Sequence, residues 1–167
     1  VFGKWSEIDD ARGAISALIV EKDTPGFTAG RPEDKMGLRA SATTPLSFDK
    51  ARVPRGNLLG QPRDGLKILL ASLNKSRPSI AAHALCIAIA AFKHLTTYMN
   101  TRRQSGRRIA EFQANQFLLA DLASELALCE AWLDHVADLI DASAADFGVE
   151  ASIAKLRASD LAMRMTT

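Results

Sequence analysis

The sequence is poor in cysteine and histidine, from which disulfide frameworks and zinc sites are built. Its 167 residues include two cysteines and three histidines. Cys86 and Cys129 each lie in a segment rich in Ala and Leu with no partner motif, which predicts two reduced thiols in the core. The histidines have no zinc-type spacing to cysteine or carboxylate, so we expect no metal site.

An excess of charge of one sign is also missing. The 21 basic and 19 acidic residues leave a net charge of +2, too little for a dedicated nucleic-acid-binding protein. No apolar run approaches the roughly 20 residues that cross a bilayer, so we expect no membrane span. Residues 1–12 lack the basic start and apolar stretch of a secretory signal. Because the chain begins in mid-pattern without methionine, we expect a fragment of a longer protein.

Glycine and proline become scarce after residue 65. Eight of the ten glycines and five of the six prolines lie in residues 1–65. Frequent Gly and Pro mark turns between short strands, and their absence marks helices. The candidate strands are 14–20, 27–29, 38–43 and 46–53. We interpret residues 1–62 as half of an antiparallel β domain, which buries too little apolar surface to stand alone.

Helical periodicity follows the glycine-rich part. Apolar residues recur at steps of three and four over residues 64–103, 109–140 and 149–165, which predicts three long helices. Pro78 lies inside the first and is expected to kink it or to mark a boundary. The third still runs at Thr167 without a stop signal, which again suggests truncation. Short connections favour an antiparallel bundle over residues 63–167, and an α+β fold class for the whole chain.

Four arginines occupy the corner between the first two predicted helices: Arg102, Arg103, Arg107 and Arg108. Carbonyl groups at the end of one helix attract cations, and free N–H groups at the start of the next attract anions. Because Arg binds phosphate through paired hydrogen bonds, the corner predicts a seat for a phosphate or pyrophosphate. A solvated helix corner and a nucleic-acid contact stay open as alternatives.

Two other polar groups interrupt the apolar stripes. Residues 74–77, with the sequence Asn-Lys-Ser-Arg, either line a cleft or lie on the solvent side of a kink at Pro78. Gln113 and Gln116 place amides on a helix, where buried amides need partners from a neighbouring helix or a ligand.

The carboxylates Asp121, Glu125 and Glu130 follow helical spacing, and we interpret them as surface charges rather than an acid/base pair. The sequence contains no Gly-rich phosphate loop and no Ser/His/Asp signature. The residues alone therefore predict a β piece joined to a helical bundle with a phosphate corner.

A series of short motifs extends along almost the whole chain. They lie at residues 19–26, 35–41, 48–54, 57–60, 64–66, 76–78, 102–106, 112–117 and 151–155. Each motif is weak alone, but their order and spacing are specific. In these motifs the sequence strongly resembles the acyl-CoA dehydrogenases.

The resemblance implies a fragment of a chain more than twice as long. The family's full chain has an N-terminal helical domain, a middle β domain and a C-terminal four-helix bundle. This piece would hold the second half of the β domain and nearly three helices of the bundle. It would belong to a homo-oligomer, a dimer or a tetramer.

The family's reaction converts an acyl-CoA thioester to the trans-2-enoyl-CoA. A glutamate takes the α proton while a hydride passes from the β carbon to FAD, and the electrons leave through electron-transfer flavoprotein. The resemblance places FAD contacts at Arg102, Gln104, Phe112 and Gln113. It places Arg102 on the FAD pyrophosphate of a neighbouring subunit. It places the lining of the acyl-CoA site at Asn74, Lys75, Ser76 and Arg77.

The resemblance leaves the chain without a catalytic residue. Some members, including isovaleryl-CoA dehydrogenase, carry the glutamate just before the arginine of the first bundle helix, where this chain has Ser76. A serine without an activating partner cannot act as a base. We therefore expect the catalytic glutamate downstream of Thr167 and no activity from the piece alone. Ser105 stands where many members have Phe.

Two alternative functions stay open. One is an acyl-CoA oxidase of the same fold, which passes electrons to oxygen. The other is a non-catalytic helical module that binds an anionic partner through residues 102–108. We expect the protein in the bacterial cytoplasm in preference to the mitochondrial matrix.

Overall fold

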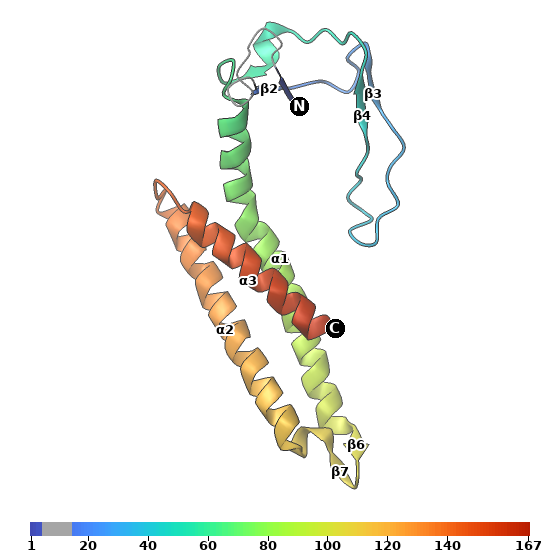
Figure 1. Ribbon diagram of the computed structural model, residues 1–167, viewed down its shortest axis with the longest axis vertical. Helices are drawn as coiled ribbons and strands as arrows, with labels where there is room; N and C mark the ends of the chain where they lie inside the picture. The colour runs from blue at the N-terminus through green and yellow to red at the C-terminus, as the bar shows by residue number, and fades with distance from the viewer. Residues whose placement is uncertain (5–14) are drawn as a thin grey trace. The chain divides into compact units, whose positions relative to one another are not determined.

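The computed structural model describes residues 1–4 and 15–167, which form two compact units, Val1–Leu70 and Ala71–Thr167 (Figure 1). Ala14, the first residue of one predicted strand, lies outside the described residues. Small antiparallel sheets and long helices confirm the α+β fold class.

The first unit contains two small antiparallel sheets. In one, β1 (Phe2–Lys4) pairs with β2 (Ile15–Leu18), and β2 pairs with β5 (Leu58–Leu59). In the other, β3 (Phe27–Ala29) pairs with β4 (Leu46–Phe48). A short 3-10 helix, η1 (Arg55–Asn57), precedes β5. The antiparallel β prediction for this part of the chain is therefore confirmed for the described strands.

Two predicted strands differ from the structure. Residues 38–43 form a turn instead of a strand, because Leu38 has a φ of 52° and the Ser41 N–H donates to the Leu38 carbonyl at 3.0 Å. The predicted strand 46–53 ends at Phe48. Lys50 has a φ of 51°, which an extended strand does not allow.

Gly26 is expected to be the least replaceable glycine of the first unit. It has a φ of 82°, and a Cβ there would overlap the carbonyl oxygen of Asp49. Gly26→Ala should therefore destabilise the unit by about 2 kcal/mol or more, measured by denaturant unfolding of the full-length protein. Gly37→Ala is the matched control, because nothing lies within 4 Å of a Cβ there. Equal stability of the two variants would contradict the expectation.

The second unit is made of long helices. It contains most of α1 (Gly65–Thr101), together with α2 (Gln113–Asp141) and α3 (Gly148–Thr166). Between α1 and α2 lie a hairpin of β6 (Arg103–Gln104) and β7 (Arg107–Arg108) and a 3-10 turn, η2 (Ile109–Glu111). The three predicted helices are confirmed, although the second starts at Gln113 because residues 109–111 form η2.

Small residues let the three helices approach closely. Ala81 and Leu85 of α1 share a buried cluster with Val136 of α2 and with Ala151 and Ala154 of α3. A second cluster joins the next turns of the same helices, with members Ala88, Leu122, Leu161 and Ala162. The helices therefore lie side by side, as Figure 1 shows.

Pro78 does not end α1. The helix continues through it, and Pro78 itself is buried. Proline has no N–H, so the backbone carbonyl of Asn74 loses the partner that a helix normally gives it. Of the two expectations for Pro78, the boundary is wrong because α1 continues through it, and the kink stays a prediction.

The two cysteines differ in their surroundings. Cys86 is exposed, so its predicted place in the core is wrong. Cys129 is half-buried, packs against both core clusters, and has a thiol pKa that burial raises. Both are free thiols, as predicted.

By length and composition alone, α1 is long and apolar enough to cross a membrane. No such helix was expected from the sequence, because its apolar residues are interrupted by polar ones. One face of α1 carries Ala81, Leu85 and Ala88 into the core clusters. A single helix of this length and composition is weak evidence for a span, because core helices of folded proteins have the same properties.

Candidate functional site

The arginine corner is a tight hairpin at the end of α1. Strands β6 and β7 pair antiparallel, with Arg103 opposite Arg108 and Gln104 opposite Arg107. The two residues between them, Ser105 and Gly106, have φ values of 52° and 82°. Two consecutive positive values are typical of the two-residue hairpin turn that suits twisted strands.

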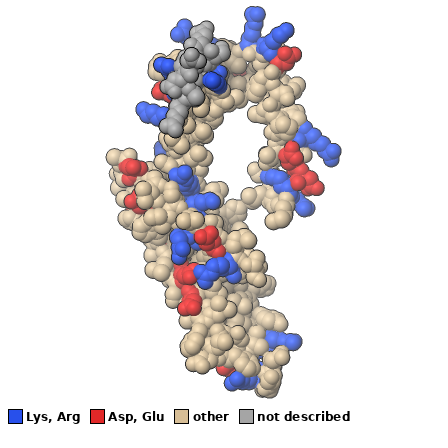
Figure 2. All heavy atoms as spheres, in the orientation of Figure 1, with Lys and Arg blue, Asp and Glu red and all other residues tan. Residues whose placement is uncertain are grey.

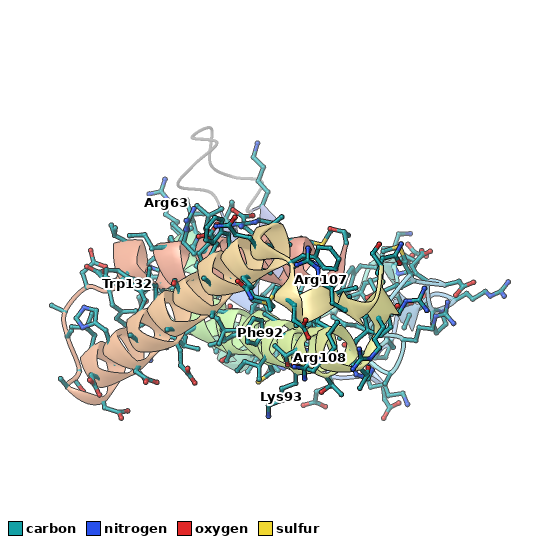
Figure 3. All side chains as sticks on the ribbon, turned by 90° about the horizontal axis from the view of Figure 1, so that it is seen from below. Arg63, Phe92, Lys93, Arg107, Arg108 and Trp132 are labelled. Atoms are coloured by element: carbon teal, nitrogen blue, oxygen red, sulfur yellow. The ribbon has the colours of Figure 1, made fainter. Side chains whose placement is uncertain are left out.

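Three of the four arginines have partners within the corner. Arg108 Nε lies 2.8 Å from Glu111 Oε1, and this hydrogen bond holds the pKa of the Glu111 carboxyl below its usual value. The Arg107 guanidinium lies 4.0 Å above the centre of the Phe112 ring, where a cation is attracted to the aromatic face. Arg103 Nη1 donates to the Gly106 carbonyl at 3.4 Å. Figure 3 shows Arg107 and Arg108 near each other at the corner.

Arg102 is the arginine of the corner that has no such partner. Its backbone is fixed, because its N–H donates to Tyr98 and its carbonyl accepts from Ile109. Its side chain is exposed and makes no hydrogen bond or ion pair within the described residues. The Arg102 guanidinium is therefore available to an anion from outside this chain. Figure 2 shows Lys and Arg side chains at this end of the helical unit.

The start of α2 adds amides and an aromatic ring. Phe112 occupies the N-cap position and is half-buried, and no side chain caps the first turn. Asn115 Nδ2 donates to Ile109, and Gln116 Nε2 donates to Ala110, so both amides tie η2 to α2. Gln113 and Gln116 are exposed, so the interpretation of these amides as buried is wrong. The Gln113 side chain makes no hydrogen bond with the described residues and is available to a ligand.

The polar stretch before Pro78 presents two pairs of side chains. Asn74 and Arg77 are half-buried, and Arg77 Nη1 donates to Asn74 Oδ1 at 2.6 Å and to Ser152 Oγ of α3 at 3.0 Å. Lys75 and Ser76 are exposed, and the Ser76 hydroxyl donates to the Leu73 carbonyl at 3.0 Å. The stretch therefore has an inner pair that contacts α3 and an outer pair that is open to a ligand.

The arginine corner and the polar stretch lie at separate positions along α1. Residues 77 and 102 are 25 positions apart, about 38 Å at about 1.5 Å per helical residue. The fold does not bring the two groups together within one chain.

The three candidate carboxylates of α2 lie at the surface or in an ion pair. Asp121 and Glu130 are exposed. Glu125 pairs with Arg164 of α3, whose Nη1 lies 2.6 Å from Glu125 Oε2. No group of three or more His, Cys, Asp or Glu that would hold a metal occurs within the described residues.

The Glu125–Arg164 pair is expected to add a small, pH-dependent stabilisation. The hydrogen bond from Arg164 holds the pKa of Glu125 below its ordinary value of 4.5. The stabilisation is therefore complete above pH 4.5 and is lost as the pH falls through the lowered value. It is small because solvent reaches both side chains. In thermal melts of the full-length protein, Glu125→Gln should lower the Tm slightly at neutral pH.

The difference in Tm between Glu125→Gln and the parent should disappear in acid, once Glu125 is protonated in the folded protein. Glu130→Gln is the control, since Glu130 is exposed and has no ion pair within the described residues. A decrease in Tm that is the same at neutral pH and in strong acid would contradict the assignment of this stabilisation to the Glu125–Arg164 pair.

Comparison with known proteins identifies the family. Residues 63–167 match the family described as "Acyl-CoA dehydrogenase, C-terminal domain". The chain belongs to the acyl-CoA dehydrogenase family. It is 49% identical over 156 residues to an acyl-CoA dehydrogenase of Bacillus subtilis, covering 93% of this chain and 41% of that protein. It is 40% identical over 161 residues to the short-chain-specific acyl-CoA dehydrogenase of Megasphaera elsdenii, and the match covers 95% of this chain and 42% of that protein.

Solved structures of the family share the fold. Butyryl-CoA dehydrogenase from Megasphaera elsdenii matches with a TM-score of 0.88 and 38% identity, covering 95% of this chain and 41% of that one. A chain solved in work on the electron transferring flavoprotein of Acidaminococcus fermentans matches with a TM-score of 0.87 and 39% identity. This match covers 99% of this chain and 42% of that one. This chain therefore spans about two fifths of the length of its acyl-CoA dehydrogenase relatives.

Sequence reasoning missed the residues that hold the polar stretch in place. Ser152 accepts a hydrogen bond from Arg77, and Gly148 lets the start of α3 approach Asn74. Ser152 lies in the acyl-CoA dehydrogenase motif at residues 151–155, which was the only signal for it. The contact between Arg107 and Phe112 was also missed, although the two residues lie close in sequence.

Proposed function

We propose that the full-length protein containing this chain is an FAD-dependent acyl-CoA dehydrogenase, which converts an acyl-CoA thioester to the trans-2-enoyl-CoA. The match of residues 63–167 to the family's C-terminal domain carries the proposal. Relatives named for short-chain, short/branched-chain and butyryl-CoA substrates support an acyl-CoA substrate.

The residues of the arginine corner fit an aromatic, anionic cofactor. Arg102, Gln104, Phe112 and Gln113 would hold FAD. The exposed Arg102 guanidinium suits a pyrophosphate, and the uncapped first turn of α2 adds free N–H groups. The half-buried Phe112 ring, with Arg107 against one face, offers an apolar surface. FAD, when bound, supplies the acceptor for the hydride that leaves the β carbon.

The distance between the two predicted sites supports a homo-oligomer. Arg102 lies about 38 Å along α1 from Arg77. One site can contain both residues if Arg102 of one subunit lies next to the polar stretch of another subunit. We therefore propose that Arg102 contacts the FAD of a neighbouring subunit.

The substrate side of the proposed site lies at residues 74–77. Lys75 and Ser76 are exposed on α1 and are proposed to contact acyl-CoA directly. Asn74 and Arg77 form the inner pair behind them. The Ser76 hydroxyl donates to its own helix and makes no hydrogen bond to a basic side chain within the described residues, so the proton-abstracting group is proposed to come from another part of the full-length protein.

Electron-transfer flavoprotein is the proposed electron acceptor. The test is anaerobic reduction of the purified full-length protein with butyryl-CoA, followed by reoxidation with oxygen or with electron-transfer flavoprotein. We expect bleaching of the flavin spectrum by the substrate and faster reoxidation by the flavoprotein. Faster reoxidation by oxygen would indicate an acyl-CoA oxidase, and no flavin after purification would indicate a non-catalytic module. The bacterial relatives support a bacterial cytoplasmic location.

A further inference from the structure

We propose that Ser152 is a positioning residue that fixes the orientation of Arg77 in the acyl-CoA site. The proposal rests on the proposed function, because it concerns the same polar stretch. It depends on a contact between residues 75 positions apart, which joins α1 to the first turns of α3.

The Ser152 hydroxyl is itself held in one orientation. It donates its proton to the Gly148 carbonyl, one turn earlier in α3, at 2.6 Å. A hydroxyl has one proton, so it faces Arg77 as an acceptor, 3.0 Å from Nη1. Ser152 therefore presents a fixed oxygen lone pair to the guanidinium.

Arg77 receives two acceptors at the same nitrogen. Nη1 donates to Ser152 Oγ and to Asn74 Oδ1, which accounts for both of its protons. Within the described residues no carboxylate pairs with Arg77, and Nε and Nη2 have no acceptor. The guanidinium is therefore half-buried and fixed at one edge, while its other donors are available to an oxygen of the bound substrate.

Two features of the polar stretch lie beside the Arg77–Ser152 contact. Pro78 removes the hydrogen bond that would normally hold the Asn74 carbonyl. The start of α3 also comes close to the Asn74 side chain: a Cβ on Gly148 would lie only 3.1 Å from Asn74 Nδ2. The Gly148 N–H is in turn held by Asp146 Oδ1 at 2.9 Å. The start of α3 thus lies close to the Asn74 side chain and accepts a hydrogen bond from Arg77.

The test compares serine variants of the full-length, FAD-loaded enzyme. Ser152→Ala should raise the Kd for trans-2-enoyl-CoA, followed by the flavin spectrum, by about tenfold, with a matching loss in kcat/KM. Ser152→Thr should restore both values, because threonine keeps the hydroxyl. Ser159→Ala is the matched control, because the Ser159 hydroxyl bonds only to carbonyls of its own helix. It should leave the Kd within about twofold.

A double-mutant cycle separates positioning from general stability. If Ser152 acts through Arg77, Ser152→Ala should cause no further loss of binding in an Arg77→Ala background. An equal loss in both backgrounds, a failure of Ser152→Thr to restore binding, or the same loss in Ser159→Ala would overturn the proposal. A parent enzyme that binds flavin but does not oxidise acyl-CoA would instead overturn the proposed function, and this inference with it.

Discussion

Replacing Arg102 with alanine in the full-length enzyme is expected to weaken FAD retention by about 1–3 kcal/mol, roughly fivefold to 150-fold in Kd. The Arg102 backbone is fixed at the end of α1, while its guanidinium has no partner within the described residues. A charge-assisted hydrogen bond to a pyrophosphate would be lost in the variant. Reconstitution of the apoprotein with FAD, followed by fluorescence, measures the change.

Lys93→Ala is the matched control for Arg102→Ala. Lys93 is an exposed cation on the same helix, so its removal changes the net charge equally. It should leave the FAD affinity within about twofold. Unchanged flavin affinity and unchanged oligomeric state in Arg102→Ala would refute the assignment of this residue.

Hybrid oligomers test whether Arg102 acts across a subunit interface. Arg102→Ala subunits are mixed with subunits in which the catalytic glutamate has been replaced by Gln. If Arg102 serves a neighbouring subunit, a hybrid contains sites with both an intact base and an intact Arg102, and activity should return. The assay uses an FAD concentration that does not saturate Arg102→Ala; if Arg102 serves its own subunit, no site has both groups, and the activity should stay as low as in the two variants alone.

The helices were predictable because their signal is local. Apolar residues at steps of three and four mark all three, and the second ends at Asp141, one residue beyond the predicted range 109–140. At Pro78 the sequence left a kink or a boundary open, because it shows the missing N–H but not the tertiary packing around the residue. The Arg77–Ser152 contact beside it joins α1 to α3 across 75 positions of the chain.

The loops were less predictable because non-glycine residues adopt unusual backbone angles there. Residues 38–43 and 46–53 have the composition of longer strands. Leu38 and Lys50 nevertheless have positive φ values, which neither residue favours and which the composition does not reveal. Hydrogen bonds from side chains, such as Lys35 Nζ to the Ser41 carbonyl, hold the loop in this form. Such contacts leave no periodic pattern in the sequence.

The candidate site was predictable as a set of segments. Motif order placed residues 74–77 and 102–113 in functional roles, which stay predictions. Which side chains of each segment face a neighbouring helix depends on tertiary packing. Arg77, of the inner pair, is recognised by its hydrogen bond to Ser152 of α3. Arg102 stands out only once Arg107 and Arg108 are seen to have partners within the corner.

The glutamate that abstracts the α proton is expected outside this chain, downstream of Thr167. Replacing that glutamate with Gln in the full-length enzyme should lower kcat by about a hundredfold to ten-thousandfold, the usual contribution of a general base. Flavin binding should be retained, because Gln has nearly the same shape. The measurement is stopped-flow reduction of the flavin by butyryl-CoA.

The carboxylates of α2 provide the controls. Asp121→Asn and Glu130→Gln should leave the rate of flavin reduction within about twofold, because both residues are exposed and have no ion pair within the described residues. Full activity in the variant of the downstream glutamate, or turnover of acyl-CoA by the isolated 167-residue chain, would contradict the assignment.

Glu125 is the carboxylate of α2 that is least suited to proton abstraction. A base must be free to reach the α proton and must have a proton affinity that matches its task. The Glu125 carboxylate is held by Arg164, and that hydrogen bond lowers its pKa, which weakens it as a base. Glu125→Gln should therefore reduce stability slightly but leave flavin reduction within about twofold. A large loss of flavin reduction in a folded, FAD-loaded Glu125→Gln enzyme would move the base into this chain.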